Sequence, residues 1–213
     1  PNTDVSWTDG LHLTYALPFG FNTHFILQHN SEKGPTNVNR SPLHFTDKGS
    51  RFTYYGLIES NKKWGPFIQR EFSVTYIPKS FLSDGIFKDY LAFVTRFGTS
   101  FDTDFEGAKF VIGGEAGYAP NTPPKTSFRT GKAEDGNAGG WAYQISVNLM
   151  ELFNAHNIGI VYGVIDDGWL LSPDLRNNNI EFETRYIWRI SSPLSFEGRG
   201  RVRRDNLAVE NAQ

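Results

Sequence analysis

Apolar residues recur at every second position over most of this chain. The longest example runs from Leu11 to Leu27, where odd positions are mainly leucine, phenylalanine and tyrosine, and most even positions are small or polar. Successive side chains of a β-strand point to opposite faces, so this period predicts a strand with one apolar and one polar face. Pro18 falls inside the stretch and indicates a bulge there.

The same alternation predicts about ten strands. A short strand is expected before Asp9-Gly10, a dipeptide typical of hairpin turns, and the strand over Leu11–Leu27 follows it. The remaining predicted strands cover residues 51–59, 71–76, 90–99, 108–118, 141–149, 157–165, 180–190 and 194–203. No linker divides them, so residues 1–213 are interpreted as a single β-barrel region without separate domains.

The connections between the predicted strands alternate in length. The short ones cover residues 9–10, 60–65, 100–106, 151–156 and 191–193, and the long ones cover 29–49, 78–88, 119–139 and 166–178. A soluble sandwich has no reason to collect its long loops at one end, whereas an outer-membrane barrel has short periplasmic turns and long outer loops. The alternation therefore predicts an all-β fold, an antiparallel transmembrane β-barrel.

The tryptophans support the same fold. All five lie at or within a few residues of a predicted strand end, namely Trp7, Trp64, Trp141, Trp169 and Trp188. Indole prefers the membrane interface, where its ring is half buried and its N–H stays hydrated. We therefore predict that these residues are interface aromatics; the alternative is a tryptophan core in a β-sandwich.

Composition excludes several classes of protein. The chain has no cysteine, which rules out disulfides and thiolate metal or redox sites. The net charge of -2 argues against a nucleic-acid partner. The mean hydropathy of -0.43 is that of a hydrophilic chain. A barrel can have such a value, because its strands turn only every second residue toward lipid.

The sequence contains no recognisable catalytic motif: HExxH, GxSxG and the phosphate-binding loop are all missing. His12 and His24 share the polar positions of one predicted strand, which would place them about 40 Å apart and exclude a joint metal site. Asp166 and Asp167 are either ligands of a hard cation or acidic turn residues. We expect no enzymatic activity, no catalytic residue, no cofactor and no metal.

Arginines gather on the polar positions of the last predicted hairpin. A turn at residues 191–193 would place Glu183 opposite Arg201 and Glu181 opposite Arg203. On a lipid-facing surface each such charge would cost about 2–4 kcal/mol near the midplane, so these residues must face water or protein. The predicted pore-lining residues are Arg185, Arg189, Arg199, Arg201, Arg203, Glu181, Glu183 and Glu197. A purely structural ladder that fixes the strand register is the alternative.

On this pattern, and most specifically over residues 179–203, the chain resembles the outer-membrane porins of Gram-negative bacteria. The resemblance implies a water-filled barrel in the outer membrane that passes small solutes and ions, with outer-membrane lipid and lipopolysaccharide around it. Porin barrels usually close on a strand that ends in an aromatic residue, whereas this chain ends Glu210-Asn211-Ala212-Gln213. We therefore expect part of a larger barrel, completed by neighbouring barrel segments or by a homo-oligomer.

Three alternatives stay open at this point. The chain could be the strand region of a larger outer-membrane transporter, which would need a plug domain that this sequence lacks. It could be a barrel enzyme acting on lipid or peptide, or a soluble β-sheet protein that binds carbohydrate through its aromatic residues.

For the porin, the excess of arginine over glutamate in the last predicted hairpin predicts a mild preference for anions that is lost at high salt.

Overall fold

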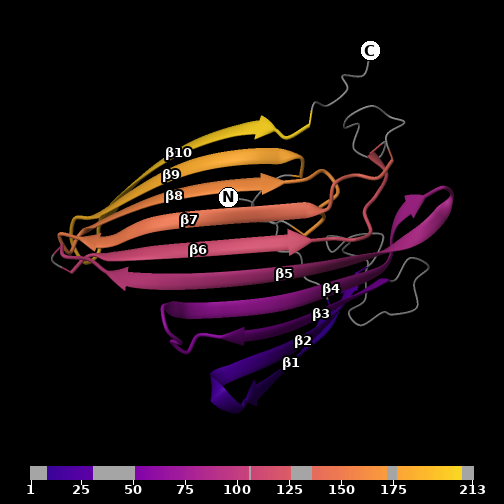
Figure 1. Cartoon of the computed structure of the whole chain (residues 1–213), viewed down its shortest axis with the longest axis horizontal. Helices are drawn as coiled ribbons and strands as arrows, with labels where there is room; N and C mark the ends of the chain where they lie inside the picture. The colour runs from indigo at the N-terminus through magenta and orange to yellow at the C-terminus, as the bar shows by residue number, and fades with distance from the viewer. Residues whose placement is uncertain (1–8, 31–50, 106, 126–135, 172–176, 208–213) are drawn as a thin grey trace.

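The computed structural model describes residues 9–30, 51–105, 107–125, 136–171 and 177–207. These residues form one ten-stranded antiparallel sheet in which every strand pairs with its neighbours in sequence (Figure 1). The strands are β1 (Asp9–Leu17), β2 (Phe21–Asn30), β3 (Arg51–Ser60), β4 (Phe67–Ser83), β5 (Ile86–Asp102), β6 (Lys109–Tyr118), β7 (Trp141–Leu152), β8 (His156–Ile165), β9 (Asn179–Arg189) and β10 (Ser195–Asp205). The predicted all-β, antiparallel class is confirmed.

The sheet is open. Within the described residues, β1 pairs only with β2 and β10 only with β9, so one edge of each outer strand has no strand partner. Figure 1 shows that the sheet twists across its width, because β1 and β2 run at a marked angle to β9 and β10. One 3-10 turn, Pro18–Gly20, is the helical element of the described chain. No helix in these ranges is long and apolar enough to cross a membrane.

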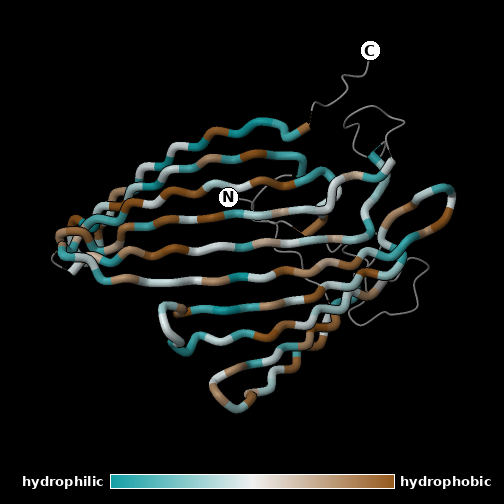
Figure 2. The backbone as a smooth tube through the Cα atoms, in the orientation of Figure 1, coloured by the Kyte–Doolittle hydropathy of each residue, from teal (hydrophilic) through white to brown (hydrophobic). Residues whose placement is uncertain are grey.

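The register places the alternating apolar side chains of neighbouring strands on the same face of the sheet, here called the apolar face. Directly paired residues point to the same side, and the register pairs Leu13 with Phe25, Tyr54 with Tyr76 and Ile145 with Tyr162. Every strand contributes exposed apolar side chains, for example Leu13, Phe25, Tyr54, Phe72, Phe97, Phe110, Ile145, Ile160, Phe182 and Val202. The alternating colours along each strand in Figure 2 follow from this arrangement. The opposite side is called the polar face.

The prediction of one continuous strand from Leu11 to Leu27 is wrong. Pro18, Phe19 and Gly20 form a tight turn, and β1 and β2 are the two arms of a hairpin. Phe19 and Gly20 both adopt positive φ, 64° and 78°, which reverses the chain direction. Asp9-Gly10 forms no turn and instead begins β1. Odd residues still share one face, because the register pairs odd with odd positions.

The expected long connection at residues 78–88 is also absent. Strands β4 and β5 continue to a two-residue turn at Asp84-Gly85, where both residues have positive φ, as a type I′ hairpin turn requires. The ladder shifts register between Ile77 and Phe81, around Pro78, which has no N–H to donate. The Asp89 carboxylate holds this irregularity by accepting hydrogen bonds from the Tyr76 hydroxyl and the Lys79 backbone N–H, at 2.6 and 2.9 Å.

The connections between strands fall into two groups, one at each end of the sheet. Residues 18–20, 61–66, 103–108, 153–155 and 190–194 link strands at one end, here called the short-turn end. At the other end, here called the long-loop end, the chain leaves and re-enters the sheet between β2 and β3, between β6 and β7 and between β8 and β9, and the tip of the β4–β5 hairpin also lies there. In Figure 1 these ends lie to the left and right, respectively, of strands β5 to β10. The predicted alternation of short and long connections therefore holds except at residues 9–10, which form no turn, and at residues 78–88, where a projecting hairpin replaces the loop.

Candidate functional site: the polar face of the sheet

The predicted register of the charged hairpin is confirmed. Strands β9 and β10 pair Glu183 with Arg201, Glu181 with Arg203, and Arg185 with Arg199. The short turn at residues 190–194 fixes this register, because the Leu194 carbonyl accepts hydrogen bonds from the Ile190 and Ser191 N–H groups and the Leu194 N–H donates to the Ser191 carbonyl. All eight residues predicted to line the pore lie in strands β9 and β10 on the polar face.

The charges of this hairpin are paired along diagonals as well as directly across. Glu183 Oε2 accepts hydrogen bonds from Arg199 Nη2 and Arg201 Nε, both at 2.7 Å. Arg203 Nε donates to Glu181, and Arg185 Nε lies 2.8 Å from Glu197 Oε1. The repulsive pair expected between Arg185 and Arg199 is relieved, since each guanidinium turns toward a different carboxylate.

Carboxylates and guanidiniums occupy different depths on this face. The side chains of Glu181 and Glu183 are only 4% and 10% exposed, whereas that of Arg199 is 52% exposed. Arg201 and Arg203 lie between these values. Glu181 and Glu183 therefore lie against the sheet with their arginine partners above them, so water over these residues meets mainly guanidinium, whereas the Glu197 side chain is 45% exposed. We call Arg199, Arg201 and Arg203, which lie above Glu181 and Glu183, the arginine layer.

A second charge cluster lies on the polar face over β4, β5 and β6. Arg96 Nη1 is 3.2 Å from Glu71 Oε1, and Arg96 Nε is 2.7 Å from Glu115 Oε2. The order of depth is the same, because the Arg96 side chain is 46% exposed and that of Glu71 is 6% exposed. The register places these three charges side by side on the polar face, so their contact depends on the pairing of three strands.

One connection folds back onto the polar face at the long-loop end. Trp169 follows β8 and packs with Tyr90, Ala92, Ala142 and others in a small core. Its indole covers Gly117, where an added Cβ would lie 2.3 Å from the ring. The Tyr90 hydroxyl accepts a hydrogen bond of 3.0 Å from the backbone N–H of Leu170, the residue after Trp169. Trp169 is only 3% exposed, so its predicted place among the interface aromatics is wrong.

The other tryptophans differ from Trp169. Trp64, Trp141 and Trp188 are exposed and lie at or near strand ends. Trp64 and Trp188 belong to the short-turn end, and Trp141 begins β7 at the long-loop end, its ring 4.5 Å from that of Tyr118. Exposed aromatic rings therefore mark both ends of the sheet, while Trp7 lies outside the described residues.

Asp166 and Asp167 hold loops together through hydrogen bonds. Asp167 Oδ1 accepts from the backbone N–H groups of Gly139 and Gly168, at 2.7 and 3.1 Å. Asp166 accepts from the Trp141 backbone N–H at 3.0 Å and from Asn206. Both carboxylates are thus used as acceptors that join the connections after β6, β8 and β10, which explains their position without a cation.

The hairpin at Pro18–Gly20 brings His12 and His24 into contact, so the predicted separation of about 40 Å is wrong. The two rings lie on adjacent strands of the polar face, with His12 Nε2 3.1 Å from His24 Nδ1. Within the described ranges, no group of three or more histidine, aspartate and glutamate side chains is placed to hold a metal ion.

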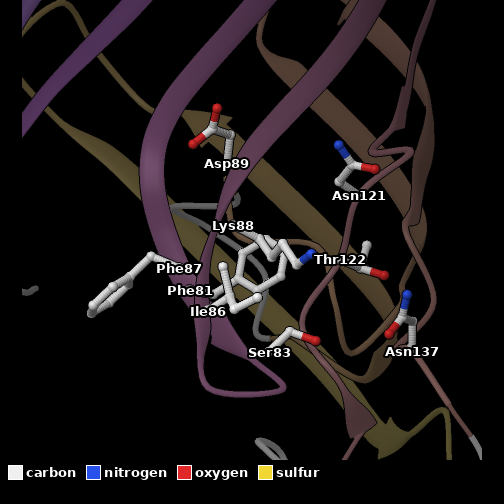
Figure 3. Close-up of a pocket in the computed structure, with 9 residues that line it drawn as sticks. All are labelled: Phe81, Ser83, Ile86, Phe87, Lys88, Asp89, Asn121, Thr122 and Asn137. Carbon is white, nitrogen blue, oxygen red and sulfur yellow. The ribbon is translucent and has the colours of Figure 1, made fainter.

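A hollow of about 560 Å³ opens at the long-loop end. Phe81, Ile86 and Lys88 of the β4–β5 hairpin line one side of it, and Asn121, Thr122 and Asn137 line the other (Figure 3). Its walls therefore combine apolar, amide, hydroxyl and ammonium groups. The carboxylate of Asp89, which also lines the hollow, accepts hydrogen bonds from the Tyr76 hydroxyl and the Lys79 backbone N–H.

Comparison with known proteins gives no relative for this chain. No protein-family model, curated protein or solved structure matches it.

Proposed function

We propose that this chain forms part of the wall of an outer-membrane β-barrel that acts as a passive, water-filled channel for small solutes and ions. The observation that carries the proposal is the apolar face, which extends over all ten strands and stays exposed. Exposed apolar patches on soluble monomers rarely exceed a few hundred Å². Lipid is the environment in which so wide an apolar surface is stable.

The ends of the sheet support the same environment. Exposed Trp64, Trp188 and Trp141 lie at opposite ends, as interfacial aromatic girdles do. The backbone groups along the free edges of β1 and β10 would have to be hydrogen-bonded within lipid. The proposal therefore includes closure of the sheet by further strands, supplied by neighbouring barrel segments or by a second copy of the chain.

The arginine layer supports a preference for anions. Glu181 and Glu183 are covered by their arginine partners, so a solute moving along the polar face meets guanidinium groups first. A local positive strip in a water-filled pore concentrates anions beside it. The inward-folded segment around Trp169 would narrow the path at the long-loop end, and the hollow next to it would form part of the entrance.

Single-cysteine labelling tests the membrane orientation, and the natural chain contains no cysteine to interfere. In membranes, a cysteine replacing Tyr15 or Phe182 on the apolar face should resist a water-soluble maleimide. A cysteine replacing Thr14 or Arg185 on the polar face should react through the open lumen. Equal labelling of both sets, or extraction of the protein without detergent, would contradict the proposal.

Reconstitution tests the channel itself. The purified protein in detergent, added to a planar bilayer, should produce stepwise conductance increases that do not require a cofactor or an energy source. A sheet that inserts but gives no steps would support a membrane role and refute the channel.

A further inference from the structure

Three donor atoms from β1 and β2 converge on the polar face beside the free edge of β1. His12 Nε2 lies 3.1 Å from His24 Nδ1, and Thr14 Oγ1 lies 3.3 Å from the former and 3.2 Å from the latter. The register explains the convergence. Thr14 of β1 is directly paired with His24 of β2, and His12 precedes Thr14 by two residues in β1, so all three side chains point to the polar face. We call these three residues the histidine triangle.

The size of this triangle matches one face of a metal coordination tetrahedron. Zn²⁺ binds histidine nitrogen at about 2.0–2.1 Å, so two ligand atoms of a tetrahedral site are about 3.3–3.4 Å apart. The three distances in the histidine triangle are within about 0.3 Å of that value. Small rotations of the three side chains would aim their lone pairs at one shared ion.

In the tautomer of His24 that carries its proton on Nε2, hydrogen bonds alone do not satisfy the three contacts. With Nε2 of His24 protonated toward Glu59, its Nδ1 can only accept, and the triangle then holds at most two protons. Three close contacts with two protons leave one contact without a hydrogen bond. A cation at the centre of the triangle would interact favourably with all three lone pairs.

The surroundings of His24 provide independent support. Its Nε2 is shielded from solvent and makes no hydrogen bond, and the Glu59 carboxylate lies 3.4 Å away. A metal on Nδ1 fixes the proton on Nε2, where Glu59 can attract it. Metal-binding histidines usually have such a carboxylate beyond the ring, which orients the imidazole and raises its basicity.

We propose that the histidine triangle binds a divalent transition-metal ion such as Zn²⁺ or Cu²⁺. Imidazole ligands select these ions over Ca²⁺ and Mg²⁺, which prefer oxygen. His12 and His24 supply the two nitrogen ligands, Thr14 supplies a weak oxygen ligand, and water completes the coordination. The site lies within strands β1 to β3, so it is independent of the proposed channel function.

Isothermal titration of the detergent-solubilised full chain with Zn²⁺ alone tests this site, provided that the protein carries no polyhistidine tag. One ion should bind per chain, and His12→Gln or His24→Gln should each weaken binding at least tenfold. His156→Gln is the matched control, because His156 is on β8 and contacts Tyr186 instead of the triangle. It should leave the affinity unchanged.

A gain-of-binding variant keeps the test decisive if a loss variant folds poorly. Thr14→His would add a third imidazole next to the other two and should tighten Zn²⁺ binding at least tenfold. With Cu²⁺ as the probe, electron paramagnetic resonance of the natural chain should show two coupled nitrogens. Absence of saturable binding, or binding that neither His12→Gln nor Thr14→His changes, would overturn the proposal and leave the histidines as a hydrogen-bonded pair.

Discussion

The arginine layer yields a test in which two single substitutions act in opposite directions. Glu183→Gln removes one negative charge from the β9–β10 hairpin, and Arg199→Gln removes one positive charge from the same ion pair. The polar face of this hairpin carries five arginines, three glutamates and Asp205, a net charge of +1, which becomes +2 or 0. Glutamine at position 183 can still accept the arginine hydrogen bonds, so we expect the fold to survive at a cost of about 1–2 kcal/mol.

The expected size of the effect follows from Coulomb's law. One charge about 7 Å from a passing ion contributes about 0.6 kcal/mol in water, and screening at 0.1 M salt reduces this to about 0.3 kcal/mol. Anions and cations are affected with opposite sign, so the permeability ratio changes by about 0.6 kcal/mol, or about threefold. Across a tenfold salt gradient this corresponds to about 20 mV of reversal potential at 0.1 M.

Reversal potentials in planar bilayers provide the measurement. Glu183→Gln should move the potential toward anion preference and Arg199→Gln toward cation preference, each by about 20 mV. At 1 M salt the Debye length is about 3 Å, and both shifts should fall to about 5 mV or less. Circular dichroism of both variants controls for folding. Shifts of the same sign, or none at either position, would show that the hairpin charges are structural and do not influence ion flow.

Two stability predictions follow from the same face. Arg96→Gln leaves a buried glutamate without its partner and should lower the free energy of unfolding by about 2–4 kcal/mol; Arg185→Gln, whose partner is exposed, should cost about 1 kcal/mol or less. Urea titration followed by tryptophan fluorescence measures both, and equal costs would contradict the assigned burial. Gly117→Ala should displace the Trp169 indole, lower the free energy of unfolding by about 1–3 kcal/mol and increase acrylamide quenching of tryptophan fluorescence. Gly56→Ala is the control, because there is open space around Gly56, and it should have none of these effects.

The fold class and the charged hairpin could be predicted because both depend on short-range pattern. A period of two residues assigns each side chain to a face, and a short turn sets which residues lie opposite one another. The contact of Glu183 with Arg201 needed only the turn at residues 191–193, and the structure confirms it. The layering of charge by depth was not predictable, because depth depends on which atoms of a long side chain are covered.

Alternation alone does not predict the hairpin of β1 and β2, because the apolar residues have odd numbers in both strands. Odd residues stay on one face after the turn, so alternation alone cannot distinguish one long strand from two paired strands. The sequence signal of the turn is Pro18-Phe19-Gly20, whereas Pro18 alone also fits a bulge within one strand. The bulge interpretation also separates His12 from His24 and hides the histidine triangle.

The two Asp-Gly dipeptides show how local turn signals depend on their flanks. Asp84-Gly85 forms a hairpin turn, because strand residues on both sides pair with each other up to Ser83 and Ile86. Asp9-Gly10 begins β1 and pairs across to β2 instead. Trp169 was misplaced for a related reason: its connection folds back onto Gly117 and Tyr90, and no nearby residue in sequence indicates that contact.

Charge and space are contributed by different strands of the polar face. The bulky arginines and glutamates lie on β9 and β10, whereas the neighbouring polar-face positions of β7 and β8 include small residues such as Ser146, Gly159 and Gly163. The Asn148 side chain lies over Gly159, and a hollow of about 200 Å³ is lined by these two residues and Arg185 among others. A solute path along β7 and β8 would thus pass beside the arginine layer without displacing it. A ladder needed only to fix the strand register would gain nothing from such open space beside it, which favours a role in ion flow.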